Sequence, residues 1–297
     1  MLFTLDGRPG PREAELRGWP GYAGSRPVRT GNGAAHQHQL DGYGWVLDAA
    51  WCLTEAGHGL YGETWRMVAG LADHVADTWT EPDAGIWERR ATPAHHVHSK
   101  LMAWLALDRA IRIADARGDR PRRQRRQWSS ARAALTDDIR IHGFDTGQGA
   151  YTGAYGSAEL DAAVLLPVLE FEPPTSPRLS GTIDAIRRQL GAGGPLLYRY
   201  PPHSDGLPGR EGAFLPCSFW LVQALARTGR HDEAASLFDE LLTLGGPLGL
   251  YGEEMDPTTG EHLGNFPQAL THAAVVQAAL ALRDANAEVT RRQRAAR

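Results

Sequence analysis

The sequence predicts an all-α fold, and three observations support this class. Apolar residues recur at spacings of three and four along most of the chain, as they do on one face of a helix. Gly, Pro, Asp and Trp crowd the segments between these runs, as in EPDAGIW and YPPHSDGLPGREG. Strand signals are sparse, and we find them only in LFTLDG at the start and in LLYRY at 196–200.

Each periodic run is bounded by helix breakers and is predicted to form one helix. The run at 96–117 follows a polar loop that supplies caps and first-turn donors. The run at 121–142 follows Asp119 as a cap and carries Pro121 in its first turn. No glycine-serine linker divides the 297 residues, so a single domain over 1–297 is predicted. Nine helices are expected, near residues 36–55, 62–78, 96–117, 121–142, 157–168, 178–190, 213–229, 231–244 and 267–286.

Composition narrows the class of protein. With 42% hydrophobic residues the chain can bury a substantial core, and a formal net charge of −4 gives no sign of a polyanionic partner. Lys100 is the only lysine, so the many arginines reflect compositional bias. Cys52 and Cys217 belong to no CxxC pattern and are expected to be reduced. The N-terminus lacks the pattern of a signal peptide, and no apolar run is long enough for a membrane span, so we expect a cytoplasmic protein without membrane contact.

Three histidines, His95, His96 and His98, raise the possibility of a metal site. His95 and His98 are three residues apart, and Glu81 or Asp83 could add an oxygen ligand. No second cluster at ligand spacing follows downstream, and the start of a helix explains polar residues here equally well. We therefore expect no metal and no cofactor.

The basic run RGDRPRRQRRQW at 117–128 is the candidate for nucleic-acid binding. It has no interleaved aromatic residues and accompanies no known nucleic-acid module. Its pattern fits the capped start of a helix with a solvated face. No nucleic-acid partner is expected.

Carboxylates and aromatic residues recur together in the loops. Glu88 follows Trp87, and Glu253 and Glu254 lie in a loop near Tyr251. Hydrolysis of a glycosidic bond needs two such acids, one protonated and one ionised, and sugar rings stack on aromatic faces. The residue types alone also fit a packed Trp beside a surface salt bridge, so both readings stay open at this point.

Five segments in order resemble glycoside hydrolase family 15, which contains glucoamylases, glucodextranases and bacterial trehalase-like enzymes. Together they cover nearly the whole chain. The segments are GYAGSRPVRTGNGAAHQHQLDGYGWVLDA, GIWERRATPAHHVHSKLMAWLALDRAIRIA, YGSAELDAAVLLPVLEFEPPTSPRLSGTIDAI, LLYRYPPHSDGLPGREGAFLPCSFWLVQALARTGRHDEA and GLYGEEMDPTTGEHLGNFPQALTHAA.

The resemblance implies an (α/α)₆ barrel of twelve helices and an inverting glycosidase that releases glucose from α-glucosides, as glucoamylases do, with trehalose as the rival substrate. Glu88 matches the general acid and Glu253 the general base, with their carboxyls expected about 6.5–9.5 Å apart to admit a water. Glu254 ranks second for the base. Substrate contacts are expected from Arg26, Trp87, Arg199, Tyr200 and Glu254.

Arg90 lies near Glu88, and a cation beside a general acid favours the unwanted ionised form. We therefore expect Arg90 to pair with another acid, Glu81 or Asp83.

The chain departs from the family pattern in one respect. Nine helices are expected instead of twelve, no Trp-x-Arg-Asp element is found, and no β-rich domain precedes the helices, so Met1 looks like an internal start. An open ring would leave apolar helix faces exposed. We expect self-association or a complementing N-terminal fragment, and the alternative function is that of a catalytically silent fragment or one half of a split enzyme.

Overall fold

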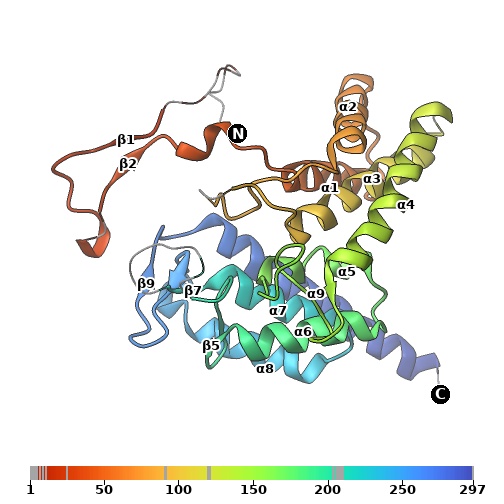
Figure 1. Ribbon diagram of the computed structural model, residues 1–297. Coiled ribbons are helices and arrows are strands. Elements are labelled where there is room, and N and C mark those ends of the chain that lie inside the picture. The colour runs from red at the N-terminus through yellow and green to blue at the C-terminus, as the bar shows by residue number, and fades with distance from the viewer. Residues whose placement is uncertain are drawn as a thin grey trace. The chain divides into compact units, whose positions relative to one another are not determined.

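The computed structural model describes residues 6, 8, 10, 12–24, 26–89, 92–118, 122–202, 204 and 211–295. Helices dominate this part of the chain (Figure 1), so the predicted all-α class is confirmed. The chain divides into two compact units, residues 1–132 and 133–297, and the boundary falls within one helix. The single domain predicted over 1–297 stays a prediction. The Arg90 pairing, the Asp119 and Pro121 signals and all of the LFTLDG strand except Asp6 lie outside the described residues.

The first unit consists of helices preceded by a short hairpin. Asn32 caps the 3₁₀ turn that leads into the first helix, since its Oδ1 accepts the Ala34 N–H at 2.8 Å. The elements are β1 (Ala14–Glu15), η1 (Tyr22–Gly24), β2 (Arg29–Thr30), η2 (Gly33–His36), α1 (Asp41–Glu55), α2 (Gly62–Thr78), α3 (Val97–Arg117) and the first half of α4 (Arg122–His142).

Helix α3 forms the core of this unit. Most of its residues are buried, and it packs against α1 and α2. Gly44 permits the close approach of α1, because a Cβ at this position would lie 2.6 Å from the carbonyl oxygen of Met102. Trp128 on α4 is fully buried, and its indole N–H donates to Asp73 on α2 at 2.8 Å. A buried Trp with its N–H bonded fixes how α4 meets α2 within this unit.

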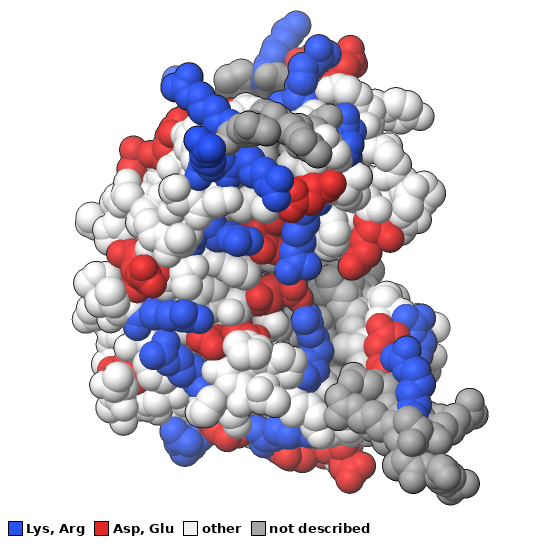
Figure 2. Space-filling model, turned by 90° about the vertical axis from the view of Figure 1, so that its right-hand side faces the viewer, with Lys and Arg blue, Asp and Glu red and all other residues white. Residues whose placement is uncertain are grey.

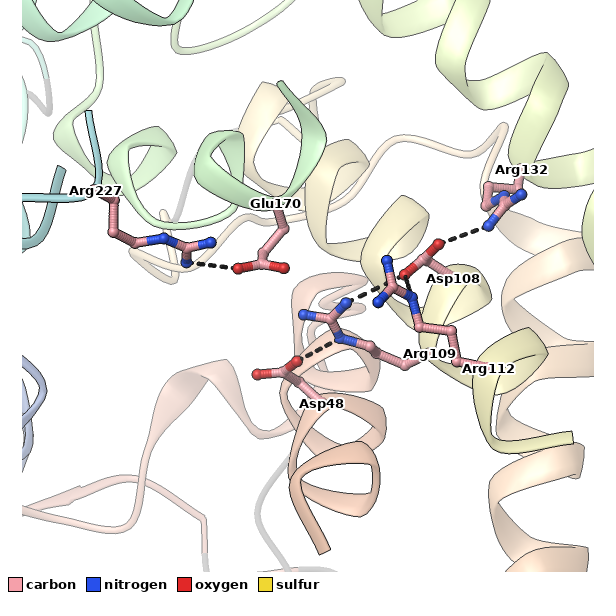
Figure 3. Close-up of polar contacts among 7 residues, drawn as sticks. All are labelled: Asp48, Asp108, Arg109, Arg112, Arg132, Glu170 and Arg227. Carbon is pink, nitrogen blue, oxygen red and sulfur yellow. Dashed lines mark hydrogen bonds and ion pairs between the residues drawn. The ribbon is translucent and has the colours of Figure 1, made fainter. Parts of the chain in front are cut away.

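A charged network lies on α3 (Figure 3). The buried Asp108 carboxylate accepts from Arg109 at 3.2 Å, Arg112 at 2.7 Å and Arg132 at 2.6 Å. Arg109 also pairs with Asp48 on α1 at 2.7 Å. The buried charges are thus paired on both sides, which is the condition under which they are tolerated in a protein interior.

The second unit packs its helices around α7. Every residue from Leu215 to Ala226 is buried, and α8 and α9 lie against this helix. Tyr151 donates to the buried Glu172 at 2.6 Å, and Arg227 on α7 pairs with Glu170 at 2.6 Å (Figure 3). The helices are the second half of α4, η3 (Ala162–Leu165), α5 (Val168–Phe171), α6 (Pro177–Gln189), α7 (Leu215–Arg227), α8 (His231–Thr243), η4 (Gly246–Leu248) and α9 (Ala269–Ala295).

Short antiparallel strands connect these helices. The pair β5–β6 contains Leu196–Leu197, so the strand predicted in LLYRY is confirmed for these two residues. In the three-stranded sheet, Phe214 pairs with Glu254, and Glu254 pairs with Leu263. The strands are β3 (Phe144–Asp145), β4 (Ala150–Tyr151), β5 (Gly191–Gly193), β6 (Leu196–Leu197), β7 (Ala213–Phe214), β8 (Glu254–Met255) and β9 (His262–Leu263).

The helix predicted at 157–168 is wrong. Residues 157–161 are not helical, residues 162–165 form only the 3₁₀ turn η3, and Gly153 N–H donates to the carbonyl oxygen of Glu159 at 2.7 Å. Asp161 has an extended backbone and uses its Oδ1 to cap η3 through the Ala163 N–H at 2.8 Å. Such local capping by Asp competes with a continuous helix. The other eight predicted helices are present, although α1 starts at Asp41 and α9 extends to Ala295.

None of the described helices is both long enough and apolar enough to cross a membrane. The cytoplasmic location stays a prediction.

Candidate active site

Glu88 lies in a tight turn between α2 and α3. Its N–H donates to the Gly85 carbonyl at 3.2 Å, and its φ of 51° is the only positive value at a non-glycine residue in the described chain. A side chain in this backbone region costs roughly 1–3 kcal/mol and persists only where the surroundings impose it. Gln37 supplies part of that constraint, since its Nε2 donates to the Arg89 carbonyl at 3.0 Å.

The side chain of Glu88 is exposed and held by Asn32. Asn32 Nδ2 donates to Glu88 Oε2 at 2.8 Å. Because Asn32 Oδ1 is used as the cap of η2, the orientation of the amide is fixed, with its NH₂ group toward Glu88. The turn and the cap therefore place one acid at the surface of the first unit in a defined orientation.

The loop that carries Glu88 is anchored at its base. Asp83 is buried, its Oδ2 accepts the Leu40 N–H at 2.9 Å, and its backbone pairs with Ala94. Lys100, also buried, donates to the carbonyl oxygens of Trp79 and, at 2.8 Å, of Glu81. These contacts tie both ends of the loop to α1 and α3.

Two adjacent acids in the second unit have different surroundings. Glu253 Oε2 accepts both the backbone N–H and the side-chain Nδ2 of Asn265, each at 3.1 Å. Glu254 lies on β8, and its carboxyl contacts Arg199 instead, at 3.7 Å. Successive side chains along an extended chain point to opposite faces, which explains the separation.

Glu254 belongs to a buried cluster around Arg199. Arg199 Nε pairs with Glu211 at 2.6 Å, and its guanidinium lies 4.8 Å from the Tyr200 ring centroid. Burial raises the pKa of Glu254 to about 7, the charges of Glu211 and Glu253 add to the effect, and Arg199 opposes it. Near neutral pH, Glu254 is therefore divided between its charged and neutral forms.

The remaining residues predicted to contact the substrate differ in how exposed they are. Arg26 is exposed, just before β2, and Trp87 is half-buried in the same turn as Glu88. Tyr200 is 3% exposed, and its ring supports the Arg199 guanidinium. The structure thus brings together Arg199, Tyr200 and Glu254 in the second unit.

The histidines pack around the Glu88 loop. His98 is buried, and burial lowers its pKa to about 3. The His96 ring lies against Gly85, where an added Cβ would come within 2.8 Å of it. Among the described residues, no group of three His, Cys, Asp or Glu side chains is placed to hold a metal ion.

Within the described part of the basic run, Arg117 ends α3 and residues 122–128 lie on α4. There Arg125 pairs with Asp115 at 2.5 Å, and Gln124 donates to Asp73 at 2.9 Å. The face of the molecule in Figure 2 carries both signs of charge throughout. This ion pair and this hydrogen bond fit the helix-face interpretation of the run.

The sequence matches the profile of glycosyl hydrolases family 15 over residues 3–280. The chain belongs to this family. It is 41% identical to a trehalase of Mycobacterium tuberculosis over 94% of this chain and 41% of the relative. It is also 38% identical to a trehalase of Thermoplasma volcanium, over 92% of this chain and 44% of that protein. The chain thus spans less than half the length of these curated relatives.

Solved structures of similar fold are more distant in sequence. A glycosidase aligns with a TM-score of 0.72 and 20% identity, over 87% of this chain and 72% of its own. A bacterial glucoamylase complexed with acarbose aligns with a TM-score of 0.67 and 14% identity, over 82% of this chain and 41% of its own. These likenesses confirm the fold class, all-α of the (α/α)₆ type, that the family 15 resemblance predicted.

Several residues of this family 15 chain that hold the predicted site residues were missed from sequence. Asn32, Asn265 and Glu211 contact Glu88, Glu253 and Arg199 respectively. The adjacent glycines in GNG and GNFP mark Asn32 and Asn265 as loop residues, and that is the only signal the sequence holds for them. Their partners depend on how the loops fold.

Proposed function

We propose that this family 15 chain hydrolyses the glycosidic bond of trehalose with inversion, with Glu88 as the general acid and Glu253 as the general base. The observation that supports trehalose as the substrate is the 41% identity to a trehalase across 94% of the chain. The likeness to glucoamylases lies below 25% identity and concerns the fold, so the glucoamylase-like activity on maltooligosaccharides ranks second.

Glu88 is the group that we propose as the proton donor to the leaving oxygen. It is exposed on a constrained turn, and the Asn32 donor occupies only one of its carboxyl oxygens, Oε2. The proton for the leaving oxygen is then carried by Oε1. Protonation of the glycosidic oxygen as the bond to the anomeric carbon breaks is the general-acid half of the reaction.

Glu253 suits the role of the base better than Glu254 does. Glu253 Oε2 accepts two N–H groups from Asn265, and donors directed at a carboxyl group favour its charged form, which a base needs. Glu254, with a pKa of about 7, is partly protonated near neutral pH and is tied to Arg199. Glu253 takes a proton from water as the water oxygen attacks the anomeric carbon.

Inversion of trehalose has a defined outcome. The attacked glucose unit becomes β-glucose, and the glucose that leaves keeps its α configuration, so one water yields one of each. Arg199, Glu254 and Tyr200 in the second unit, with Arg26 and Trp87 in the first, are the proposed substrate contacts. Carboxylates and guanidinium groups bind sugar hydroxyls, and aromatic faces stack on sugar rings.

The test is glucose release by the purified chain from trehalose, maltotriose and starch. Glu88→Gln and Glu253→Gln are expected to abolish release, whereas Glu261→Gln, an exposed acid in the same β8–β9 hairpin as Glu253, serves as the matched control. Glu254→Gln should retain more activity than Glu253→Gln. Wild-type activity in either catalytic variant would refute the assignment, and a preference for maltotriose would refute the substrate.

A fragment that works only with a partner is the second candidate. The observation that favours it is the row of exposed apolar side chains on α1, namely Trp45, Val46 and Leu53. Exposed apolar surface of this kind marks an interaction site. Glucose release that appears only when the N-terminal part of a family relative is added would support this reading, and full activity of the chain alone would exclude it.

A further inference from the structure

Both proposed catalytic glutamates are held in the same manner. In each unit an asparagine Nδ2 donates to the Oε2 atom of the glutamate, at 2.8 Å from Asn32 to Glu88 and at 3.1 Å from Asn265 to Glu253. The two asparagines lie in different loops and share no sequence motif beyond a neighbouring glycine. The common feature is therefore the contact itself.

At Glu88 the orientation of the amide is not free to change. Asn32 Oδ1 accepts the Ala34 N–H at 2.8 Å, which is the cap of η2. Rotation of the amide by half a turn would place NH₂ against this N–H and oxygen against the carboxyl, so both contacts would be lost. The cap thus keeps the NH₂ group of Asn32 directed at Glu88.

At Glu253 the same carboxyl oxygen is enclosed on the protein side. Oε2 receives the backbone N–H of Asn265 as well as its Nδ2. Gly264 is so close that a Cβ there would lie 2.8 Å from Oε2. Oε2 is thus surrounded by the β8–β9 hairpin, and Oε1 is the oxygen that is left for chemistry.

We propose that Asn32 and Asn265 are matched positioning residues, which hold Oε2 of each glutamate and thereby make Oε1 the reacting oxygen. This inference rests on the proposed function. At Glu88 the O–H bond at Oε1 breaks as the proton passes to the glycosidic oxygen, whose bond to the anomeric carbon breaks. At Glu253 Oε1 takes a proton from the water that forms the new bond to that carbon.

Paired substitutions at Asn32 separate positioning from folding. Asn32→Asp keeps an oxygen cap for the Ala34 N–H but loses the donor to Glu88, whereas Asn32→Ala loses both. We expect Asn32→Asp to stay folded through its cap and to lower kcat roughly tenfold or more with little change in KM, because a second carboxylate replaces the amide donor beside Glu88. Wild-type kcat in Asn32→Asp would overturn the proposal.

At Asn265, substitutions separate the effect of the side-chain donor from that of the backbone N–H. Asn265→Ala removes the Nδ2 donor and leaves the backbone N–H, and Asn265→Ser restores a side-chain donor. A fall in kcat of roughly tenfold in Asn265→Ala, with partial recovery in Asn265→Ser, is expected. Gln127→Ala is the control, since Gln127 makes a similar exposed amide contact to Asp77 at 2.8 Å on the helices. An equal loss in Gln127→Ala would contradict a specific role.

A readout that needs no turnover distinguishes this inference from the proposed function. In NMR spectra of the ¹⁵N-labelled chain, the side-chain amide signals of Asn32 and Asn265 should move as pH is varied, because each donates to an ionisable carboxyl. Glu88→Gln should abolish the movement for Asn32 only, and Glu253→Gln for Asn265 only. Movement that persists in these variants would overturn the positioning contacts, whereas activity that persists in them would overturn the catalytic assignment alone.

Discussion

The ammonium nitrogen of Lys100 lies 2.8 Å from the carbonyl oxygen of Glu81 and also donates to the carbonyl of Trp79. The side chain is 1% exposed, and it is the only lysine of the chain. The buried amino group of Lys100 therefore bonds two backbone carbonyls where the chain enters the loop that carries Glu88. Carbonyl groups at a loop base are satisfied in this way when no secondary structure is available to pair them.

Substitution Lys100→Met should destabilise the first unit. It removes a charged donor from two carbonyl oxygens, and we expect the free energy of unfolding in urea to fall by about 2–4 kcal/mol. An amine-reactive reagent gives a second measurement. Labelling of the peptide that contains Lys100, read by mass spectrometry, should be slow in the native chain and rapid in urea. Rapid native labelling would contradict the burial of this side chain.

Glu254 should make stability depend on pH. Burial raises its pKa from 4.5 to about 7, so the folded chain binds its proton more tightly than the unfolded chain. The stabilisation is present below 4.5 and is lost as pH rises through about 7. Between about pH 5 and pH 8, wild type should lose on the order of 1–3 kcal/mol relative to Glu254→Gln, which stays neutral. Parallel curves of unfolding free energy against pH for the two proteins would refute this.

Two glycines of the β8–β9 hairpin provide a matched pair for the site. Gly264 and Gly260 have φ values of +71° and +74°, so alanine at either should cost about 1 kcal/mol of stability. Only at Gly264 would the new Cβ meet the Glu253 carboxyl, at 2.8 Å from Oε2, while Gly260 faces open space. We expect glucose release to fall at least tenfold in Gly264→Ala and to be unchanged in Gly260→Ala. Equal activities would show that the close approach has no effect on Glu253.

Substitutions in the ion-pair network around Asp108 should lower the free energy of unfolding by different amounts. Asp108→Ala removes a buried carboxylate that pairs with the buried Arg109 guanidinium and should lower the free energy of unfolding by about 3–5 kcal/mol. Arg112 is 51% exposed, so Arg112→Ala should change it by less than about 1 kcal/mol. Urea unfolding of both variants measures the difference. Equal losses would contradict the burial of Asp108 as the source of the effect.

The helices were predictable because their signal is local and periodic. The bounds expected for α2, 62–78, are those observed, since Gly62 and Thr78 flank a clear apolar stripe. The segment 157–168 failed because Asp161 bonds its own neighbouring backbone, which apolar spacing does not report. The cap of η2 by Asn32 is a similar local event.

The sequence led to the two acids that we propose for the site, but it did not indicate their hydrogen-bond partners. Glu88 and Glu253 came from the family resemblance, and the opposite orientation of Glu253 and Glu254 follows from the alternation of side chains along an extended segment. The Asn32 to Glu88 contact joins positions 56 residues apart, and the Glu253 to Asn265 contact crosses a hairpin. Such pairings are fixed by loop conformation, for which no periodic pattern exists in the sequence.

The left-handed backbone at Glu88 has a consequence for how this position can vary. Glycine would adopt the observed φ of 51° without strain, but Glu88→Gly would also lose the Asn32 contact and add conformational freedom to the unfolded chain. Glutamate at this position therefore carries backbone strain that glycine would not, and it supplies the carboxyl that we propose as the general acid.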